Sequence, residues 1–242
     1  MADPAPFEWV NRDRSGPVLL LCEHASNWMP EGYAGLGLSR TDRERHIAWD
    51  IGAAAVARHI AERTGAPLIL AGASRLLIDL NRPLSSRTSI PEQSEATAVP
   101  GNIGITPAER DARAQRWFHP FQREVQGWLD RAKARGERPA VVGIHSFTPV
   151  FLGERRPWQA GILFRKSAAY AGRLIEGLGG AEAMIAGNQP YQIDDDSDYT
   201  VPVHGEARGL ESVLVELRQD LVAGPRGQAD WADRLTPLLM RG

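Results

Sequence analysis

Short apolar runs alternate along the chain with stretches of helical period. The runs, bounded by proline, glycine or charge, predict buried strands at Val18–Cys22, Pro67–Ala71, Leu76–Leu80, Ala140–Ile144, Gln159–Arg165 and Ser212–Leu217. Apolar residues spaced by three and four predict helices over Trp49–Thr64, Pro107–Ala134, Ala168–Leu178 and Asp230–Met240. Because strands and helices alternate, we expect an α/β fold of three layers (αβα), with helices on both faces of a mainly parallel sheet.

Two long stretches, Leu84–Thr106 and Asn188–Gly209, show no regular period. The first is rich in Ser, Thr, Pro and Gly, and the second carries the acidic run Asp194–Asp196. An irregular stretch of this length inside a compact domain is typically a functional lid or a disordered segment. No repeat or linker divides the chain, so we expect residues 1–242 to form a single domain.

Composition narrows the class of protein. Hydrophobic residues make up 43% and charged residues 24%, which permits a substantial core. A net charge of −2 argues against nucleic acid or an anionic membrane as a partner. Cys22 is the single cysteine, so an internal disulfide is excluded and a reducing compartment is expected. The polar start and the lack of a membrane-length apolar run predict a cytoplasmic protein, and the pattern leaves the oligomeric state unknown.

Histidines follow two of the predicted strands. His24 comes just after Val18–Cys22, and His145 ends the run that begins at Ala140. In open α/β sheets, ligands bind outside the carboxyl ends of the strands. The two strand-end histidines therefore predict one site built from both halves of the chain.

Two histidines at one site favour a catalytic metal. Catalytic zinc takes three protein ligands from His, Asp and Glu and leaves one position for water. Asp50 is the first candidate for the third ligand, although its place before a helix makes an N-cap role an equal alternative. Glu23 is the fallback ligand, or else a partner that orients an imidazole, because neighbours on a strand point to opposite faces.

A carboxylate in an apolar strand indicates a catalytic base. Glu216 lies within VLVEL, and a buried carboxylate is rare unless it is paired or functional. It would take a proton from activated water and deliver it to the leaving amine. The alternative is a salt bridge to Arg208 or Arg218.

Asn81 and Arg82 follow the apolar run Leu76–Leu80 and suit a substrate carboxylate. Arginine binds a carboxylate bidentately, and an amide both donates and accepts. The alternative is a strand-end cap beside a surface arginine. Arg75 is a candidate for a second contact with the anion, although a role in a structural ion pair is the favoured interpretation. His204, in the second irregular stretch, could polarise a scissile carbonyl, although a lone loop histidine seldom does so.

Other enzyme classes lack their signatures here. No G-x-S-x-G elbow is present, which disfavours a serine hydrolase. No G-x-G-x-x-G or phosphate-cradling loop is present either.

Taken together, these segments resemble the N-formylglutamate amidohydrolase family, which is related to zinc carboxypeptidases and to succinylglutamate desuccinylase-type deacylases. The matching segments run from about Leu20 to Leu221 and read CEHASNWMP, HIAWDIGA, SRLLIDLNRP, GIHSFTPVF, GNQPY with YTVPVHG, and VLVELRQDL. The resemblance implies a zinc-carboxypeptidase-like α/β fold with a central mixed sheet. It also implies zinc-dependent hydrolysis of N-formyl-L-glutamate to formate and L-glutamate, a step in histidine degradation.

The resemblance carries over residue by residue. The carboxypeptidase pattern has a His with a Glu three residues on, an Asn-Arg pair, a later His and a late Glu base. The matching residues here are His24, Asn81, Arg82, His145 and Glu216. Asn27 stands where the early Glu would be, and the resemblance therefore favours Asp50, which the amidohydrolase branch carries in the pair WD.

Two alternatives remain at this point. Related amidohydrolases and carboxypeptidase-like hydrolases share such a site and differ in the acyl group, so another N-acyl amino acid could be the small-molecule substrate. A carboxylate-binding or metal-binding protein without turnover is the alternative from another class. Glu216 argues against it, because binding alone has no use for a base.

Overall fold

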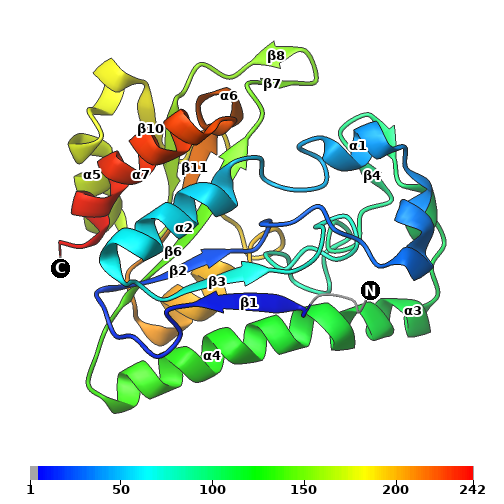
Figure 1. The fold of residues 1–242 in the computed structure, drawn as a ribbon, viewed down its shortest axis with the longest axis horizontal. Coiled ribbons are helices and arrows are strands. Elements are labelled where there is room, and N and C mark those ends of the chain that lie inside the picture. Colours follow the sequence, from blue (N-terminus) through cyan, green and yellow to red (C-terminus); the bar gives the residue numbers. More distant parts are fainter. Residues whose placement is uncertain (1–4, 242) are drawn as a thin grey trace.

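The computed structural model describes residues 5–241, and within them a seven-stranded sheet forms the centre of the molecule (Figure 1). The strand order is β1-β3-β2-β6-β11-β9-β10. The bounds are β1 Phe7–Val10, β2 Val18–Cys22, β3 Leu68–Ala71, β6 Ala140–Phe147, β9 Ala160–Leu163, β10 Ile185–Gly187 and β11 Ser212–Arg218. Strands β3, β2, β6 and β11 are parallel, whereas β1 and β9 each run antiparallel to a neighbour. The expected mixed, mainly parallel sheet is confirmed.

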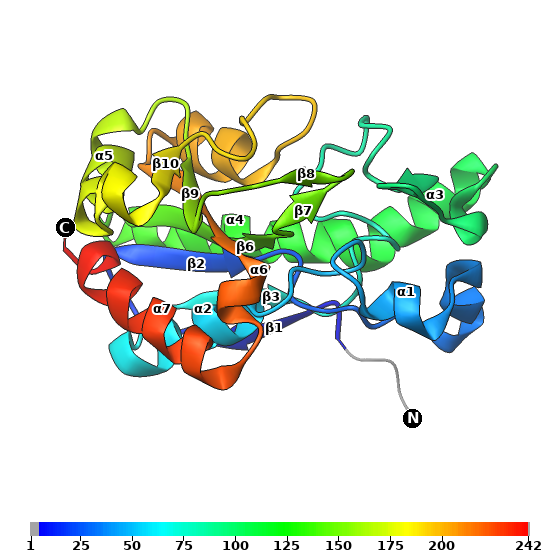
Figure 2. The same ribbon diagram turned by 90° about the horizontal axis from the view of Figure 1, so that it is seen from above.

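Helices cover both faces of this sheet. Figure 2 shows α2 and α7 on one face and α4 on the opposite face. The bounds of the helices are α1 Arg40–Glu44, α2 Ala53–Thr64, α3 Pro107–Arg113, α4 His119–Ala134, α5 Ala168–Gly177, α6 Gln219–Val222 and α7 Pro225–Leu239. The three-layer arrangement is therefore as expected. None of the described helices is both long and apolar enough to cross a membrane.

The sheet divides the core into two apolar clusters. Leu20 of β2 packs in the cluster that holds side chains of α2 and α7, whereas Leu19 and Leu21 face the cluster that holds side chains of α4. This division follows from the two-residue period of a strand. Every residue of β2 is buried, because a central parallel strand is covered on both faces, and this explains its uninterrupted apolar sequence.

The long helix predicted over Pro107–Ala134 is present, but it contains a π-helical turn. Helix α3 passes into this turn at Ala114–Phe118, and α4 follows directly. Pro120 lies in the first turn of α4. A proline inside a helix removes one amide hydrogen and crowds the carbonyl four residues earlier. The wider π-helical turn before it gives that ring room.

Several predicted elements differ from the structure. The run Leu76–Leu80 forms turns and not a strand, although its apolar side chains are buried. Strand β1 was not predicted; it lies at the edge of the sheet, where its residues are only partly buried or exposed. Helix α2 begins at Ala53 and not at Trp49. Its N-cap Gly52 has φ +83°, and a Cβ there would lie 2.2 Å from the carbonyl oxygen of Val222, so only glycine fits.

The two irregular stretches are largely without regular structure, as predicted. Leu84–Thr106 contains the small hairpin β4 Gln93–Ser94 and β5 Thr97–Ala98. Asn188–Gly209 contains a π-helical turn at Thr200–Gly205. A second small hairpin, β7 Val150–Phe151 with β8 Glu154–Arg155, follows β6. All three segments contribute side chains to one cavity.

Candidate active site

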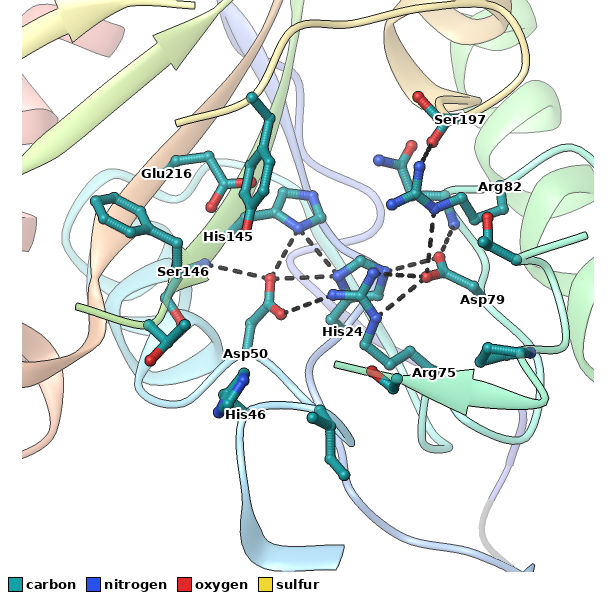
Figure 3. Close-up of a pocket in the computed structure, with 18 of the residues that line it drawn as sticks. His24, His46, Asp50, Arg75, Asp79, Arg82, His145, Ser146, Ser197 and Glu216 are labelled. Carbon is teal, nitrogen blue, oxygen red and sulfur yellow. Dashed lines mark hydrogen bonds and ion pairs between the residues drawn. The ribbon is translucent and has the colours of Figure 1, made fainter. Parts of the chain in front are cut away.

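The carboxyl ends of β2, β6 and β11 bring three predicted site residues to one edge of the sheet. His24 lies just beyond β2, whereas His145 and Glu216 are register partners on β6 and β11. All three line a cavity of about 450 Å³ that also takes in Asp50 (Figure 3). Parallel strands end at the same edge of a sheet, which is why residues so distant in the sequence meet here.

His24, Asp50 and His145 form a buried cluster whose candidate ligand atoms lie within 4.8 Å of one another. The Nδ1 atoms of the two histidines face each other at 3.2 Å. Asp50 Oδ2 lies 3.2 Å from His24 Nδ1 and 2.9 Å from His145 Nδ1 (Figure 3). Two imidazole nitrogens and one carboxylate oxygen are a donor set of catalytic zinc. The cluster could therefore hold a divalent metal ion.

Asp50 does not cap helix α2. The N-cap residue is Gly52, and no side chain bonds the first turn of that helix. Asp50 Oδ2 instead accepts from the backbone N–H of Ser146 at 3.2 Å, and Oδ1 accepts from Arg75 at 3.3 Å. The backbone N–H of Asp50 donates to the carbonyl of His24 at 3.0 Å, which fixes the two residues side by side. The N-cap alternative is excluded.

Two further carboxylates face the outer nitrogens of the imidazoles. His24 Nε2 lies 2.8 Å from Asp79 Oδ1, and His145 Nε2 lies 3.1 Å from Glu23 Oε2. A carboxylate in this place sets the tautomer of a metal-ligating histidine and leaves its other nitrogen free. Glu23 thus occupies the place of an orienting partner and lies outside the cavity lining. The chain turns at Glu23 and His24, just beyond the end of β2.

Asp79 was missed as a site residue by the sequence reasoning. It is buried, and both of its oxygens are engaged, Oδ1 by His24 and by the backbone N–H of Asn81, and Oδ2 by Arg75. The available signal was a charge inside the apolar run LLIDL, the same signal that pointed to Glu216.

Glu216 is buried without a cationic partner in the described part of the chain. Arg218 pairs with Asp220, and Arg208 pairs with Asp130, so the salt-bridge alternative is excluded. Its Oε2 atom has no hydrogen-bond partner within residues 5–241. Burial raises the pKa of Glu216 to about 7, while His145 opposes this shift and the Asp50 carboxylate adds to it. A carboxyl group with such a pKa can both take and return a proton near neutral pH.

Asn81 lines the cavity, but its amide is largely engaged in holding the chain. Its Oδ1 accepts from the backbone N–H groups of Tyr199 at 3.2 Å and Thr200 at 2.9 Å. Its Nδ2 donates to Asp198 Oδ1 at 3.4 Å. The side chain thus anchors the irregular segment 188–209 to the wall of the cavity.

Arg82 and Arg75 also line the cavity, and both interact with Asp79. Arg82 Nε lies 3.8 Å from Asp79 Oδ2, and Arg82 Nη1 donates to the carbonyl of Ser197 (Figure 3). Arg75 lies 2.8 Å from Asp79 Oδ2 and 3.3 Å from Asp50 Oδ1, so its structural ion pairs are present. About a quarter of each arginine side chain stays exposed, at 27% and 25%.

His204 lies apart from these residues and does not line the cavity. It is fully buried, its Nε2 is 2.6 Å from Gln122 Oε1, and its ring meets the edge of Tyr199. Burial lowers the pKa of His204 to about 4, so the ring is neutral at neutral pH. This placement gives no support to the predicted contact with a scissile carbonyl.

The sequence profile of the N-formylglutamate amidohydrolase family matches residues 16–223. The chain belongs to this family. Membership makes it a hydrolase of amide bonds, and the substrates of such enzymes are small molecules. A search of curated proteins found no match.

Two solved structures are similar to this chain over nearly its whole length. Gene product Atu2144 from Agrobacterium tumefaciens is 38% identical with a TM-score of 0.94, and the match covers 98% of this chain and 94% of that one. An N-formylglutamate amidohydrolase from Ralstonia eutropha JMP134 is 19% identical with a TM-score of 0.67, covering 98% and 97% of the two chains. The second likeness is one of fold alone.

Proposed function

We propose that this protein is a zinc-dependent deformylase that hydrolyses N-formyl-L-glutamate to formate and L-glutamate, a reaction of histidine degradation. The observation that carries the proposal is the buried His24–Asp50–His145 cluster, which shares one cavity with Glu216. Family membership over residues 16–223 supports the same chemistry.

The proposed metal ligands are Nδ1 of His24, Nδ1 of His145 and a carboxylate oxygen of Asp50. The donor set fits a divalent metal because Asp79 and Glu23 hold the outer nitrogens, which turns both inner nitrogens toward Asp50. A zinc ion bound there supplies a Lewis acid that lowers the pKa of water and polarises the substrate carbonyl.

Glu216 is the proposed general base. It takes a proton from the attacking water and returns it to the nitrogen of glutamate, which leaves as an amine when the amide C–N bond breaks. Its raised pKa suits both transfers. Its register partner on the neighbouring strand is His145, so the carboxyl group lies next to the proposed metal site.

Arg82 is the main proposed contact for a substrate carboxylate. Its guanidinium is only partly engaged by Asp79 and the Ser197 carbonyl and remains exposed to the cavity. Asn81 contributes less, because its amide already holds the segment 188–209. Arg75 adds positive potential from beside Asp50 and Asp79.

The proposal is tested by release of formate from N-formyl-L-glutamate, with N-acetyl- and N-succinyl-L-glutamate as competing substrates. We expect the formyl compound to be hydrolysed fastest. A wild type that holds zinc but prefers another acyl group would contradict the substrate assignment. A wild type that binds these compounds and hydrolyses none would favour the carboxylate-binding alternative.

The variant Glu216→Gln tests the chemistry separately from binding. We expect it to lose at least about 100-fold in kcat, because general-base catalysis is worth that much, while it keeps zinc and binds substrate in calorimetry. Glu211→Gln, an exposed carboxylate just before β11, is the matched control. Unchanged activity of Glu216→Gln would show that another group is the base.

A further inference from the structure

Tyr191 lines the cavity but has no part in the mechanism proposed for Glu216 and the metal ligands. It belongs to the segment GNQPY and reaches the same cavity as Glu216 and Arg75. The residue is 41% exposed, which is high for a large aromatic side chain in a folded protein. Its phenol oxygen accepts a hydrogen bond from Arg156 Nη1 at 2.7 Å.

Arg156 is held by aromatic rings and not by a carboxylate. Its guanidinium lies 4.5 Å from the ring centre of Phe151, 4.8 Å from that of Tyr191 and 6.0 Å from that of Phe147. No carboxylate in residues 5–241 comes within ion-pair distance of it, whereas Arg75 and Arg82 both pair with Asp79. Cation–π contacts of this kind hold a guanidinium against a ring. Arg156 thus fixes Tyr191 against the β7–β8 hairpin.

The hydrogen bond from Arg156 determines what the phenol can still do. A phenol has one hydrogen to donate and an oxygen that accepts. Arg156 occupies the oxygen, and within the described residues the Tyr191 hydroxyl donates to no protein acceptor. A hydrogen bond accepted from a cation polarises the O–H group of the phenol and makes that group a stronger hydrogen-bond donor. Partial desolvation by the surrounding side chains and the nearby Glu216 carboxylate raise the pKa of Tyr191, so the proton stays in place at neutral pH.

We propose that Tyr191 is a catalytic residue that donates a hydrogen bond to the acyl oxygen of the substrate as negative charge develops there, and that Arg156 is the positioning residue that holds it. This inference rests on the proposed function. Donors directed at a developing oxyanion stabilise the transition state more than the bound substrate.

The surroundings of the phenol favour the acyl oxygen over the substrate carboxylate. Glu216 raises the pKa of Tyr191 and Arg75 lowers it, so both charges act on the hydroxyl. Arg75 contacts Asp50, and Glu216 is the register partner of His145, so the two charges border the proposed metal site, where the scissile amide must lie.

The first test is Tyr191→Phe, with Tyr199→Phe as the matched control. Tyr199 lies on the same segment, outside the cavity lining, and packs edge-on against Phe118. We expect Tyr191→Phe to lower kcat about 100-fold, as removal of one oxyanion donor does. KM should stay within about twofold, because the contact forms in the transition state. A raised KM with unchanged kcat, or no change in either, would overturn the proposal.

The second test asks whether Arg156 acts through Tyr191. We expect Arg156→Ala to lower kcat and Arg156→Lys to recover part of it, whereas Arg155→Ala, an exposed neighbour, should have no effect. In the Tyr191→Phe background, Arg156→Ala should change kcat by less than about threefold, because residues that act as a unit are not additive. If the double variant instead loses kcat by the product of the two single losses, Arg156 does not act through Tyr191 and the positioning role is overturned.

A binding measurement separates this inference from the proposed function. In the Glu216→Gln background, calorimetry should give the same Kd for N-formyl-L-glutamate with and without Tyr191→Phe, and zinc content should be equal. A Kd weakened by Tyr191→Phe would overturn the transition-state role. If the wild type is active but Tyr191→Phe does not lower kcat at constant KM and Kd, the inference fails and the proposed function stands. If the wild type hydrolyses none of the three N-acyl glutamates, the proposed function fails and the inference fails with it.

Discussion

The Glu23 carboxylate lies 3.1 Å from Nε2 of His145, on the side of the imidazole away from the His24–Asp50–His145 cluster. Asp79 stands in the same relation to His24, at 2.8 Å. Each histidine thus has a carboxylate at its Nε2 atom, and Asp50 lies near the Nδ1 atoms of both rings. The cluster has three candidate ligands supported by two orienting groups.

Removal of Asp50 should abolish metal binding. We expect Asp50→Ala to contain almost no zinc after purification, as for His24→Ala and His145→Ala, because two ligands do not form a stable catalytic zinc site. Metal content per chain by elemental analysis, with circular dichroism to confirm folding, gives the result. A folded Asp50→Ala that keeps stoichiometric zinc would restore Glu23 as the third ligand. A wild type that contains no metal and is insensitive to chelator would contradict the metallohydrolase mechanism.

Glu23→Gln should weaken metal binding without abolishing it. Loss of an orienting carboxylate typically costs about 10- to 100-fold in metal affinity or activity. Competition with a chromogenic chelator measures this change directly. An affinity equal to that of the wild type would mean that Glu23 has no part in holding His145. A complete loss of metal would show that Glu23 is itself a ligand.

Asn81→Ala distinguishes an anchor from a substrate contact. The substitution leaves the backbone N–H groups of Tyr199 and Thr200 without their acceptor, and Thr200 is fully buried. We expect the free energy of unfolding to fall by about 2 kcal/mol, the typical cost of an unsatisfied buried donor. Urea denaturation supplies the value. Unchanged stability together with a raised KM would instead assign Asn81 to the substrate alone.

His204 should make the stability of the fold dependent on pH. Burial lowers the pKa of His204 from 6.5 to about 4 in the folded protein. The unfolded chain therefore binds this proton at a higher pH than the folded chain. The titration of His204 leaves the free energy of unfolding unchanged above pH 6.5. That free energy falls as the pH drops from 6.5 toward 4, by up to about 3 kcal/mol.

Urea denaturation of the wild type and of His204→Gln at several pH values tests this expectation. The difference in unfolding free energy between the two proteins should be constant from pH 7 to 8 and should shrink in favour of the variant from pH 6.5 to 5. A difference that stays constant over the whole range would show that His204 is not held neutral by burial.

The sequence by itself determined the central strands and the edge at which the site forms. Strands β2, β6 and β11 were predicted because a parallel strand buried on both faces must be apolar throughout. His24, His145 and Glu216 were predicted for one site because parallel strands end at a common edge. These inferences need only the local pattern and the general rule of sheet topology.

Tertiary structure alone decided the roles of the remaining side chains. The run Leu76–Leu80 is buried as an apolar strand would be, but it forms turns and pairs with no strand of the described chain. The sequence left an N-cap role open for Asp50, and the structure has Gly52 at that cap instead. Arg156 had no signal in the sequence, because its partner Tyr191 lies on a distant segment. A local pattern records which residues are buried, but the atom that each polar group faces depends on contacts between distant segments.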